Sequence, residues 1–134
     1  MKNPSTPLRI KKKVLVADDD PGIVDVLQII LEEANYDVTT TTNGHTIPIA
    51  QKLHPDLILL DVWMSGEDGR EICKYLKSQR STKSIPIIMI SATRDLAESA
   101  KNAGAESFIA KPFQMDDLLA KVAQYVAGGT NART

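Results

Sequence analysis

The chain has 134 residues, of which 43% are hydrophobic and 25% charged, and this is the size and composition of one ordinary globular domain. Its 16 basic and 17 acidic residues give a net charge of −1, which lends no support to broad charge-driven binding of nucleic acids or membranes. Apolar runs stay well short of the roughly 18 residues that span a bilayer, and residues 1–10 lack the apolar core of a signal peptide. The single cysteine excludes an internal disulfide and fits a reducing compartment, so we expect a cytoplasmic protein.

Short strands alternate with amphipathic helices along the chain. Apolar or β-branched runs predict strands at residues 14–17, 37–42, 57–60, 85–90 and 107–110. Apolar residues at three- and four-residue spacing predict helices at about residues 21–33, 47–53, 70–78, 95–103 and 115–126. This alternation predicts an α/β fold of the flavodoxin-like, doubly wound (βα)5 type, a three-layer sandwich whose parallel sheet has the order 2-1-3-4-5.

Local signals set the ends of several predicted elements. Asp20 precedes Pro21 and fits the N-cap of the first helix, and Asn35 is expected to end that helix in the left-handed conformation. Asn43-Gly44 indicates a turn, and residues 62–69 are expected to form a loop. We place the domain at residues 11–127, with flexible tails at 1–10 and 128–134.

The apolar stripes of the helices predict which side chains are buried. For the first helix, the stripe contains Ile23, Val26, Leu27, Ile30 and Leu31. For the third helix, the residues expected in the core are Ile72, Cys73, Tyr75 and Leu76.

Reactive or charged side chains follow several of the predicted strands directly. Asp18 and Asp19 follow the first strand, Asp61 the third, Ser91 the fourth and Lys111 the fifth. In an open α/β sheet the carboxyl ends of the strands form the edge where ligands bind, and the first and third strands are neighbours in the predicted order. We therefore expect three carboxylates in one pocket, facing a hydroxyl and an ammonium.

This set of groups suits phosphoryl chemistry. Three close carboxylates repel one another unless a cation or a proton neutralises them, and hard oxygen ligands suit Mg²⁺. Lys111 and Ser91 can bind phosphoryl oxygens. Asp61 is then the best-placed nucleophile, and its attack on phosphorus would form an aspartyl phosphate.

The chain resembles the receiver domain of bacterial two-component response regulators over about residues 12–127. The matching segments are residues 14–21 (VLVADDDP), 56–61 (DLILLD), 68–69 (DG), 88–92 (IMISA), 104–105 (GA) and 108–113 (FIAKPF). Each segment alone would be a weak signal, but their order and their positions at strand ends match the family.

The resemblance implies a role for each residue of the pocket. Asp61 would be the phosphoacceptor, Asp19 a direct Mg²⁺ ligand, and Asp18 a ligand that acts mostly through water. The backbone carbonyl of Trp63 would complete the protein ligands. Because Trp63 is large and apolar, we expect it to shield the phosphoryl group from water.

The resemblance also implies a switch. Ser91 and Lys111 would bind the phosphoryl oxygens, and Phe108 would turn inward behind Ser91. Lys111-Pro112 is expected to be a cis peptide that aims the lysine. The sequence departs from the family at Ser65, where proline is usual, so the loop is expected to be looser.

The implied function is a signalling switch that turns over no external metabolite. A sensor histidine kinase or a histidine phosphotransfer protein would donate the phosphoryl group, and the domain would catalyse its own phosphotransfer and slow dephosphorylation. The modification would bias a surface on the fourth helix, fifth strand and fifth helix. An unidentified downstream protein would bind there, and a homodimer could form through the same face. Direct contact with nucleic acid or membrane is not expected.

Two other classes of protein remain as alternatives. A phosphatase of the haloacid dehalogenase type also uses an aspartate nucleophile and Mg²⁺, and Asp18-x-Asp20 fits its opening motif superficially. Gly22 stands where that motif has threonine, however, and the chain leaves no room for a cap domain. The other alternative is a protein-binding module that works without phosphate. An Asp61→Ala variant separates the three classes.

Overall fold

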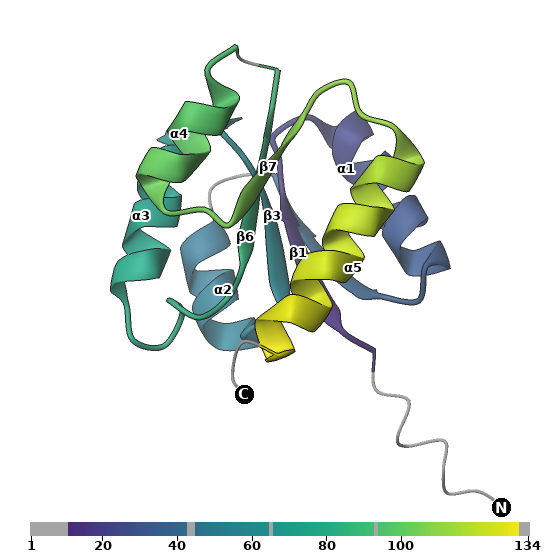
Figure 1. The fold of residues 1–134 in the computed structure, drawn as a ribbon, viewed down its shortest axis with the longest axis horizontal. Coiled ribbons are helices and arrows are strands. Elements are labelled where there is room, and N and C mark those ends of the chain that lie inside the picture. Colours follow the sequence, from purple (N-terminus) through teal and green to yellow (C-terminus); the bar gives the residue numbers. More distant parts are fainter. Residues whose placement is uncertain (1–10, 43–44, 65, 93, 132–134) are drawn as a thin grey trace, which may run out of the picture.

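A parallel β-sheet forms the centre of the molecule (Figure 1). The structure, a computed structural model, describes residues 11–42, 45–64, 66–92 and 94–131. The strand order is β2-β1-β3-β6-β7, and all neighbours are parallel. The strands are β1 (Lys13–Ala17), β2 (Asp37–Thr41), β3 (Leu57–Asp61), β6 (Ile87–Ser91) and β7 (Ser107–Ala110). In chain order these are the first to fifth strands of the sheet, so the predicted order 2-1-3-4-5 is confirmed.

Helices cover both faces of the sheet (Figure 1). They are α1 (Pro21–Glu33), α2 (Thr46–Leu53), α3 (Gly69–Ser78), α4 (Leu96–Ala103) and α5 (Met115–Asn131). Side chains of α1 and α5 pack on one face, and those of α2, α3 and α4 pack on the other. The three-layer sandwich predicted from the alternation of strands and helices is therefore confirmed.

The middle strand β3 is apolar because it is covered on both faces. Ile58 and Leu60 point into the layer of α2, α3 and α4, whereas Leu57 and Leu59 point into the layer of α1 and α5. All four side chains are fully buried. Complete burial of an aliphatic side chain stabilises a fold by about 1.5–3 kcal/mol, so this strand anchors both halves of the core. It ends at Asp61.

Several helix ends form as their residues predict. Asp20 is the N-cap of α1, and its Oδ1 accepts a hydrogen bond of 2.9 Å from the N–H of Gly22. Asn35 follows α1 with a φ of 77°, and Gly104 follows α4 with a φ of 89°. These residues fix where the chain turns back toward the sheet.

Other boundaries differ from those predicted. The fourth strand of the sheet begins at Ile87 because Pro86 has no N–H for the ladder, although the Pro86 carbonyl accepts a bond from Ile58. The last helix continues to Asn131, beyond the predicted end at Val126 and into the predicted tail. Its glycines weaken a helix by about 1 kcal/mol each but, unlike proline, do not block its hydrogen bonds. The predicted turn at residues 43–44 and the tails at 1–10 and 132–134 lie outside the described residues.

Two predicted core residues are exposed instead. Val26 in α1 is 48% exposed, and Tyr75 in α3 is 43% exposed. In α1 the inner stripe includes Val24, which is buried while Val26 faces outward.

The helices in the described part of the chain all lack the combination of length and hydropathy that a membrane crossing requires.

Candidate functional site

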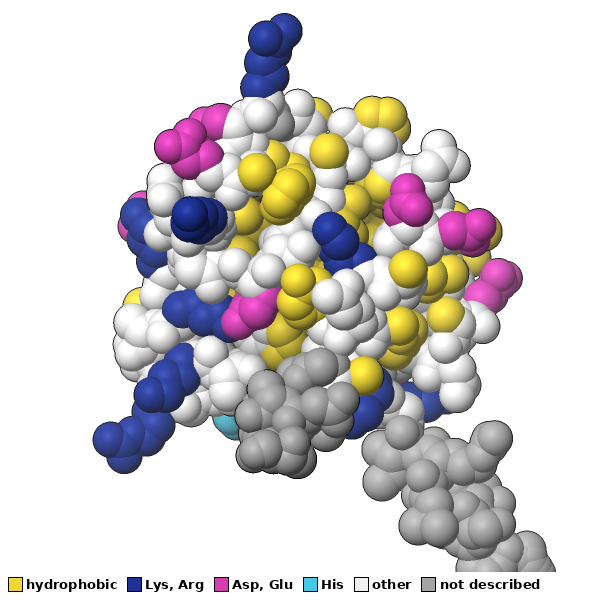
Figure 2. Space-filling view, viewed as in Figure 1, with side chains coloured by type: hydrophobic (Ala, Val, Ile, Leu, Met, Phe, Trp, Pro, Cys, Tyr) yellow, Lys and Arg dark blue, Asp and Glu magenta, His cyan; other side chains and the backbone are white. Residues whose placement is uncertain are grey.

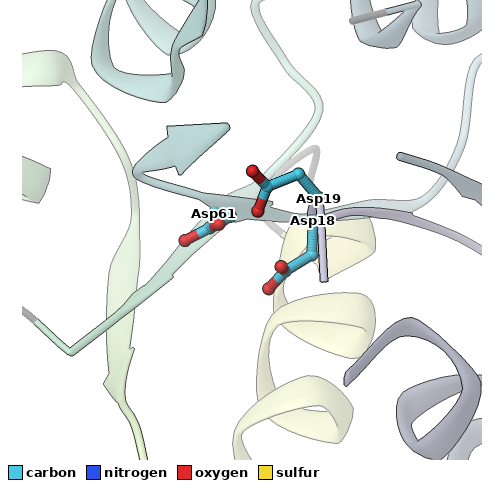
Figure 3. Close-up of side chains that lie close together, drawn as sticks. All are labelled: Asp18, Asp19 and Asp61. Carbon is cyan, nitrogen blue, oxygen red and sulfur yellow. The ribbon is translucent and has the colours of Figure 1, made fainter. Parts of the chain in front are cut away.

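Three carboxylates meet at the carboxyl ends of β1 and β3 (Figure 3). Asp18 and Asp19 directly follow β1, and Asp61 is the last residue of β3. Because Ala17 and Leu60 are paired in the sheet, the residues after them emerge side by side. One oxygen from each carboxylate lies within 4.8 Å of the others. The predicted convergence of these residues is confirmed, and Asp18 and Asp61 are almost fully buried.

Asp18 is held in place by contacts on both carboxylate oxygens. Its Oδ1 accepts a hydrogen bond of 3.0 Å from the N–H of Asp20. Its Oδ2 accepts a hydrogen bond of 2.8 Å from the ammonium of Lys111. The Asp18 N–H also donates to the carbonyl of Thr41 at 3.2 Å. The carboxylate therefore has a fixed orientation toward the pocket.

Lys111 enters the pocket from the far side of the sheet. It follows β7, its N–H donates to the carbonyl of Ser91 at 2.9 Å, and its bond to Pro112 is cis, as expected. The ammonium nitrogen lies 3.8 Å from Oδ1 of Asp61 as well as close to Asp18. Burial alone would lower the pKa of Lys111, but the hydrogen bond and the charge of Asp18, with the charge of Asp61, raise it above its usual value. Lys111 is therefore a fixed positive charge.

Asp61 has an unusual pKa for an aspartate. Its pKa is raised from 3.8 to about 7, first by burial and then by the charges of Asp18 and Asp19. The positive charge of Lys111 and a hydrogen bond from the N–H of Trp63 act in the opposite direction. The pocket thus holds more negative charge than its lysine compensates, and it favours a cation.

Ser91 and Phe108 occupy different environments. Ser91 ends β6 and is 4% exposed, and its neighbour Ile90 pairs with Asp61 across the sheet. Phe108 in β7 is 37% exposed, and the ammonium of Lys121 lies 5.4 Å from the centre of its ring. Ser91 is therefore at the same edge as the carboxylates, whereas Phe108 is on the outer surface. The switch roles of both residues stay predictions.

A short hairpin replaces part of the loop that was predicted after Asp61. Trp63–Met64 (β4) and Glu67–Asp68 (β5) pair in antiparallel fashion, and two-residue strands are too short to produce a sequence pattern. Gly69 then begins α3 so close to β3 that a Cβ there would overlap the carbonyl oxygen of Asp61. The departure at Ser65 lies outside the described residues.

The hairpin carries contacts that the motifs did not reveal. Arg70 donates from Nε to Oδ1 of Asp68 at 2.9 Å and from Nη2 to Oδ2 at 2.8 Å. The guanidinium carbon of Arg70 lies 4.5 Å from the centre of the Trp63 ring. The sequence feature that could have indicated this contact is the pair Trp63 and Arg70, which flank a short segment containing two glycines. We call these three residues the Trp63–Arg70–Asp68 clamp.

Known proteins match this chain along most of its length. The model of the response regulator receiver domain family matches residues 14–123. The DNA-binding dual master transcriptional regulator RpaA of Synechocystis is 35% identical over 113 residues, which are 82% of this chain and 47% of RpaA. The DNA-binding response regulator MtrA of Mycolicibacterium smegmatis is 31% identical over 116 residues, or 84% of this chain and 50% of MtrA. The chain thus spans about half the length of these relatives.

Solved structures agree with the sequence matches. The CheY-like receiver domain protein of Methanospirillum hungatei has a TM-score of 0.85 and 26% identity, covering 92% of this chain and 99% of that one. The chemotaxis response regulator CheY4 of Vibrio cholerae has a TM-score of 0.80 and 30% identity, covering 87% and 99%. With the acidic pocket at the expected edge of the sheet, these matches show that the chain belongs to the response regulator receiver domain family.

Proposed function

We propose that Asp61 accepts a phosphoryl group from a phosphohistidine, carried by a sensor histidine kinase or a histidine phosphotransfer protein, in a Mg²⁺-dependent reaction in the cytoplasm. The observation that carries this proposal is the cluster of three carboxylates with oxygens within 4.8 Å of one another, beside a lysine ammonium 3.8 Å from Asp61. Membership of the receiver domain family supports it.

The residues of the pocket fit a magnesium ion. Carboxylate oxygens are the hard ligands that Mg²⁺ prefers, and a divalent cation would offset the charges of Asp18 and Asp19, which add to burial in raising the pKa of Asp61. We assign Asp19 and Asp61 as direct ligands, Asp18 as a ligand through water and the backbone carbonyl of Trp63 as a further ligand. Bound Mg²⁺ would offset the charge that gathers on the phosphoryl oxygens.

The residues of this chain can supply the transfer step themselves. A carboxylate oxygen of Asp61 attacks phosphorus, a P–O bond forms, and the P–N bond of the phosphohistidine breaks with its electron pair passing to the imidazole nitrogen. The Lys111 ammonium already lies beside both Asp18 and Asp61 and can pair with one phosphoryl oxygen. The Ser91 hydroxyl can donate to another. Slow attack by water on the aspartyl phosphate then returns Asp61 to its free form.

The output surface is proposed to be the face formed by α4, β7 and α5. On this face Figure 2 shows hydrophobic side chains among Lys and Arg side chains, and a groove of about 510 Å³ runs between β7 and α5. Phosphorylation would draw Ser91 toward the phosphoryl group and let the exposed Phe108 turn inward, which changes this face. A downstream protein or a second copy of the chain would bind there. We propose no direct contact with nucleic acid, given the net charge of −1.

Labelling with a small phosphodonor tests the proposal. Acetyl phosphate with Mg²⁺ should add one phosphoryl group to the wild-type protein, as measured by intact mass, and chelation of Mg²⁺ should prevent it. Asp61→Ala should abolish labelling, whereas Asp25→Ala on the exposed surface of α1 should not. Labelling that persists in Asp61→Ala would contradict the assignment. Continuous release of phosphate from an added phosphomonoester would favour the phosphatase alternative instead.

A further inference from the structure

We propose that Arg70 is a positioning residue that holds the hairpin after Asp61 in place and thereby tightens Mg²⁺ binding in the carboxylate pocket. Arg70 itself touches neither the carboxylates of the pocket nor the phosphoryl site; it acts through Trp63. The inference rests on the proposed function in one respect, because it takes the backbone carbonyl of Trp63 as a ligand of the metal.

The Trp63–Arg70–Asp68 clamp closes a ring of contacts across the hairpin. Trp63 and Asp68 are backbone partners in the antiparallel pair. Asp68 holds the Arg70 guanidinium through two parallel hydrogen bonds of 2.9 and 2.8 Å, and it also accepts the Arg70 N–H at 2.9 Å as the N-cap of α3. The guanidinium in turn lies over the Trp63 ring at 4.5 Å. Arg70 therefore connects the first strand of the hairpin to the start of α3.

Within the first strand of the hairpin, Met64 packs in the core, whereas the side chain of Trp63 has few described contacts. Each strand has two residues, and a ribbon of that size is only marginally stable by itself. Gly66, between the strands, has a φ of 74° and open space around it, so it adds backbone freedom. Met64 is buried, but the Trp63 side chain is 52% exposed and is not fixed by the core. Its described ring contact is the one with Arg70.

Motion at Trp63 would reach the pocket directly. Its N–H donates to the Asp61 carboxylate, and its carbonyl belongs to the next peptide unit. Val62 lies between Asp61 and Trp63 in the chain. Its carbonyl accepts a hydrogen bond of 2.6 Å from the N–H of Gly69, which ties Val62 to the start of α3. The clamp thus adds a side-chain contact at Trp63, which lies between Val62, tied to α3, and Met64, buried in the core. Asp18 and Asp19 follow β1, on the other side of the pocket. Loss of the clamp should therefore affect the Trp63 carbonyl and leave these two carboxylates in place.

A purely structural role for Arg70 predicts a different result. The side chains of Arg70 and Asp68 are 32% and 26% exposed, and ion pairs at such positions contribute little to global stability. If Arg70 acts by positioning, its removal should change the pocket while the midpoint of thermal unfolding without metal stays nearly constant. If Arg70 is only structural, stability should fall and the properties of the folded pocket should not change.

The test uses the full chain and measures Mg²⁺ affinity by calorimetry and Trp63 motion by time-resolved fluorescence anisotropy. Arg70→Ala should weaken Mg²⁺ binding about tenfold, the lower end of the range for a residue that orients a metal ligand. In the metal-free protein it should also lower the anisotropy of Trp63. Arg70→Lys keeps a cation but loses the two-bond fork, and it should fall between Arg70→Ala and wild type. Lys74→Ala, whose lysine pairs with Glu71 one turn along α3, is the control and should change neither quantity.

Each result decides the proposal. A Mg²⁺ affinity of Arg70→Ala equal to that of wild type, or a loss matched by Lys74→Ala, would overturn it. Unchanged Trp63 anisotropy in Arg70→Ala would overturn the role of the clamp even if Mg²⁺ binding is weakened, because Arg70 would then not act by fixing Trp63. A wild-type protein that binds no Mg²⁺ would instead overturn the proposed function, and with it the link between clamp and metal. With Trp63→Ala as background, Arg70→Ala should have little further effect on Mg²⁺ affinity, because the two residues act as a unit.

Discussion

The ammonium of Lys111 lies 2.8 Å from Oδ2 of Asp18, although the two residues are 93 positions apart in the chain. Asp18 follows β1 and Lys111 follows β7, so this contact joins the ends of strands that are not neighbours in the sheet. In the described structure the lysine is engaged with a carboxylate of the pocket. Pairing with a phosphoryl oxygen would require it to exchange that partner.

Lys111→Met should destabilise the metal-free protein and increase its affinity for Mg²⁺. Removing one partner of a mostly buried ion pair leaves its carboxylate uncompensated, so we expect the free energy of unfolding to fall by about 3 kcal/mol. The same loss of positive charge removes a competitor of the metal. Urea unfolding in the presence of a chelator and calorimetric titration with Mg²⁺ measure the two effects, with the exposed Lys101→Met as control. Weaker Mg²⁺ binding by Lys111→Met would contradict this prediction.

Asp61→Asn should stabilise the metal-free protein increasingly as the pH rises. The pKa of Asp61 is raised to about 7 in the folded protein, by burial first and by Asp18 next, against an ordinary value of 3.8. The proton therefore binds more tightly to the folded state, and the stability that it contributes is present below about pH 4 and is lost as the pH rises through 7. Asparagine never ionises and escapes that loss.

The expected gain of Asp61→Asn over wild type grows by about 2 kcal/mol between pH 4 and pH 8, half of what the full shift in pKa would give, because such tightly coupled groups share their charge. Urea unfolding at several pH values in the presence of a chelator measures it. Asp25→Asn, on the exposed side of α1, is the matched control for the change from carboxylate to amide. A constant difference for Asp61→Asn would show that the burial of this carboxylate costs the fold nothing.

Trp63→Asn should shorten the lifetime of the aspartyl phosphate. The Trp63 N–H donates to the Asp61 carboxylate, and its indole is 52% exposed. The predicted shielding role is that this large apolar side chain, two residues from the phosphoacceptor, limits the approach of water. We expect hydrolysis to become several-fold faster, as measured by loss of the phosphoryl group after the donor is removed. Tyr75→Asn replaces another exposed aromatic, one on α3, and serves as control. An unchanged lifetime in Trp63→Asn would eliminate the shielding role.

Lys77→Met should destabilise the fold without affecting phosphorylation. The Lys77 ammonium donates to the Ile85 carbonyl at 2.6 Å and to Oε2 of Glu106 at 2.7 Å, and Oε1 of Glu106 accepts the Ile87 N–H at 2.8 Å. These bonds join α3 to the beginnings of β6 and β7, at the end of the sheet opposite the pocket. We expect the free energy of unfolding to fall by about 1–3 kcal/mol. Acetyl phosphate labelling at a temperature where the variant is folded should match that of wild type, and a lower rate would contradict the prediction.

The convergence of Asp18, Asp19 and Asp61 could be predicted because it depends on strand order and strand ends alone. Alternation of strand and helix determines that the sheet is parallel, and a parallel sheet brings the residues after β1 and β3 to one edge. The N-cap role of Asp20 could be predicted for a similar reason, because it depends only on the residues next to it in the chain. These features require only short-range patterns and the handedness of the crossovers.

The particular partners of the side chains could not be predicted in the same way. The engagement of Lys111 with Asp18 depends on the path of the chain after β7, and the stacking of Arg70 on Trp63 depends on a hairpin of two-residue strands. The exposure of Val26 shows a further limit, since an apolar residue at the margin of a helical stripe can face either the core or the solvent. Side-chain geometry at a distance is decided by packing, which no short pattern encodes.

The lack of space for a Cβ at Gly69, beside the carbonyl oxygen of Asp61, limits how this protein can evolve. A Cβ at position 69 would occupy the place of that oxygen, so every other amino acid would displace the end of β3. Gly66 is constrained differently, since open space surrounds it and its φ of 74° is one that asparagine also adopts. We therefore expect descendants of this protein to tolerate substitution at position 66 but to keep glycine at position 69, where α3 begins.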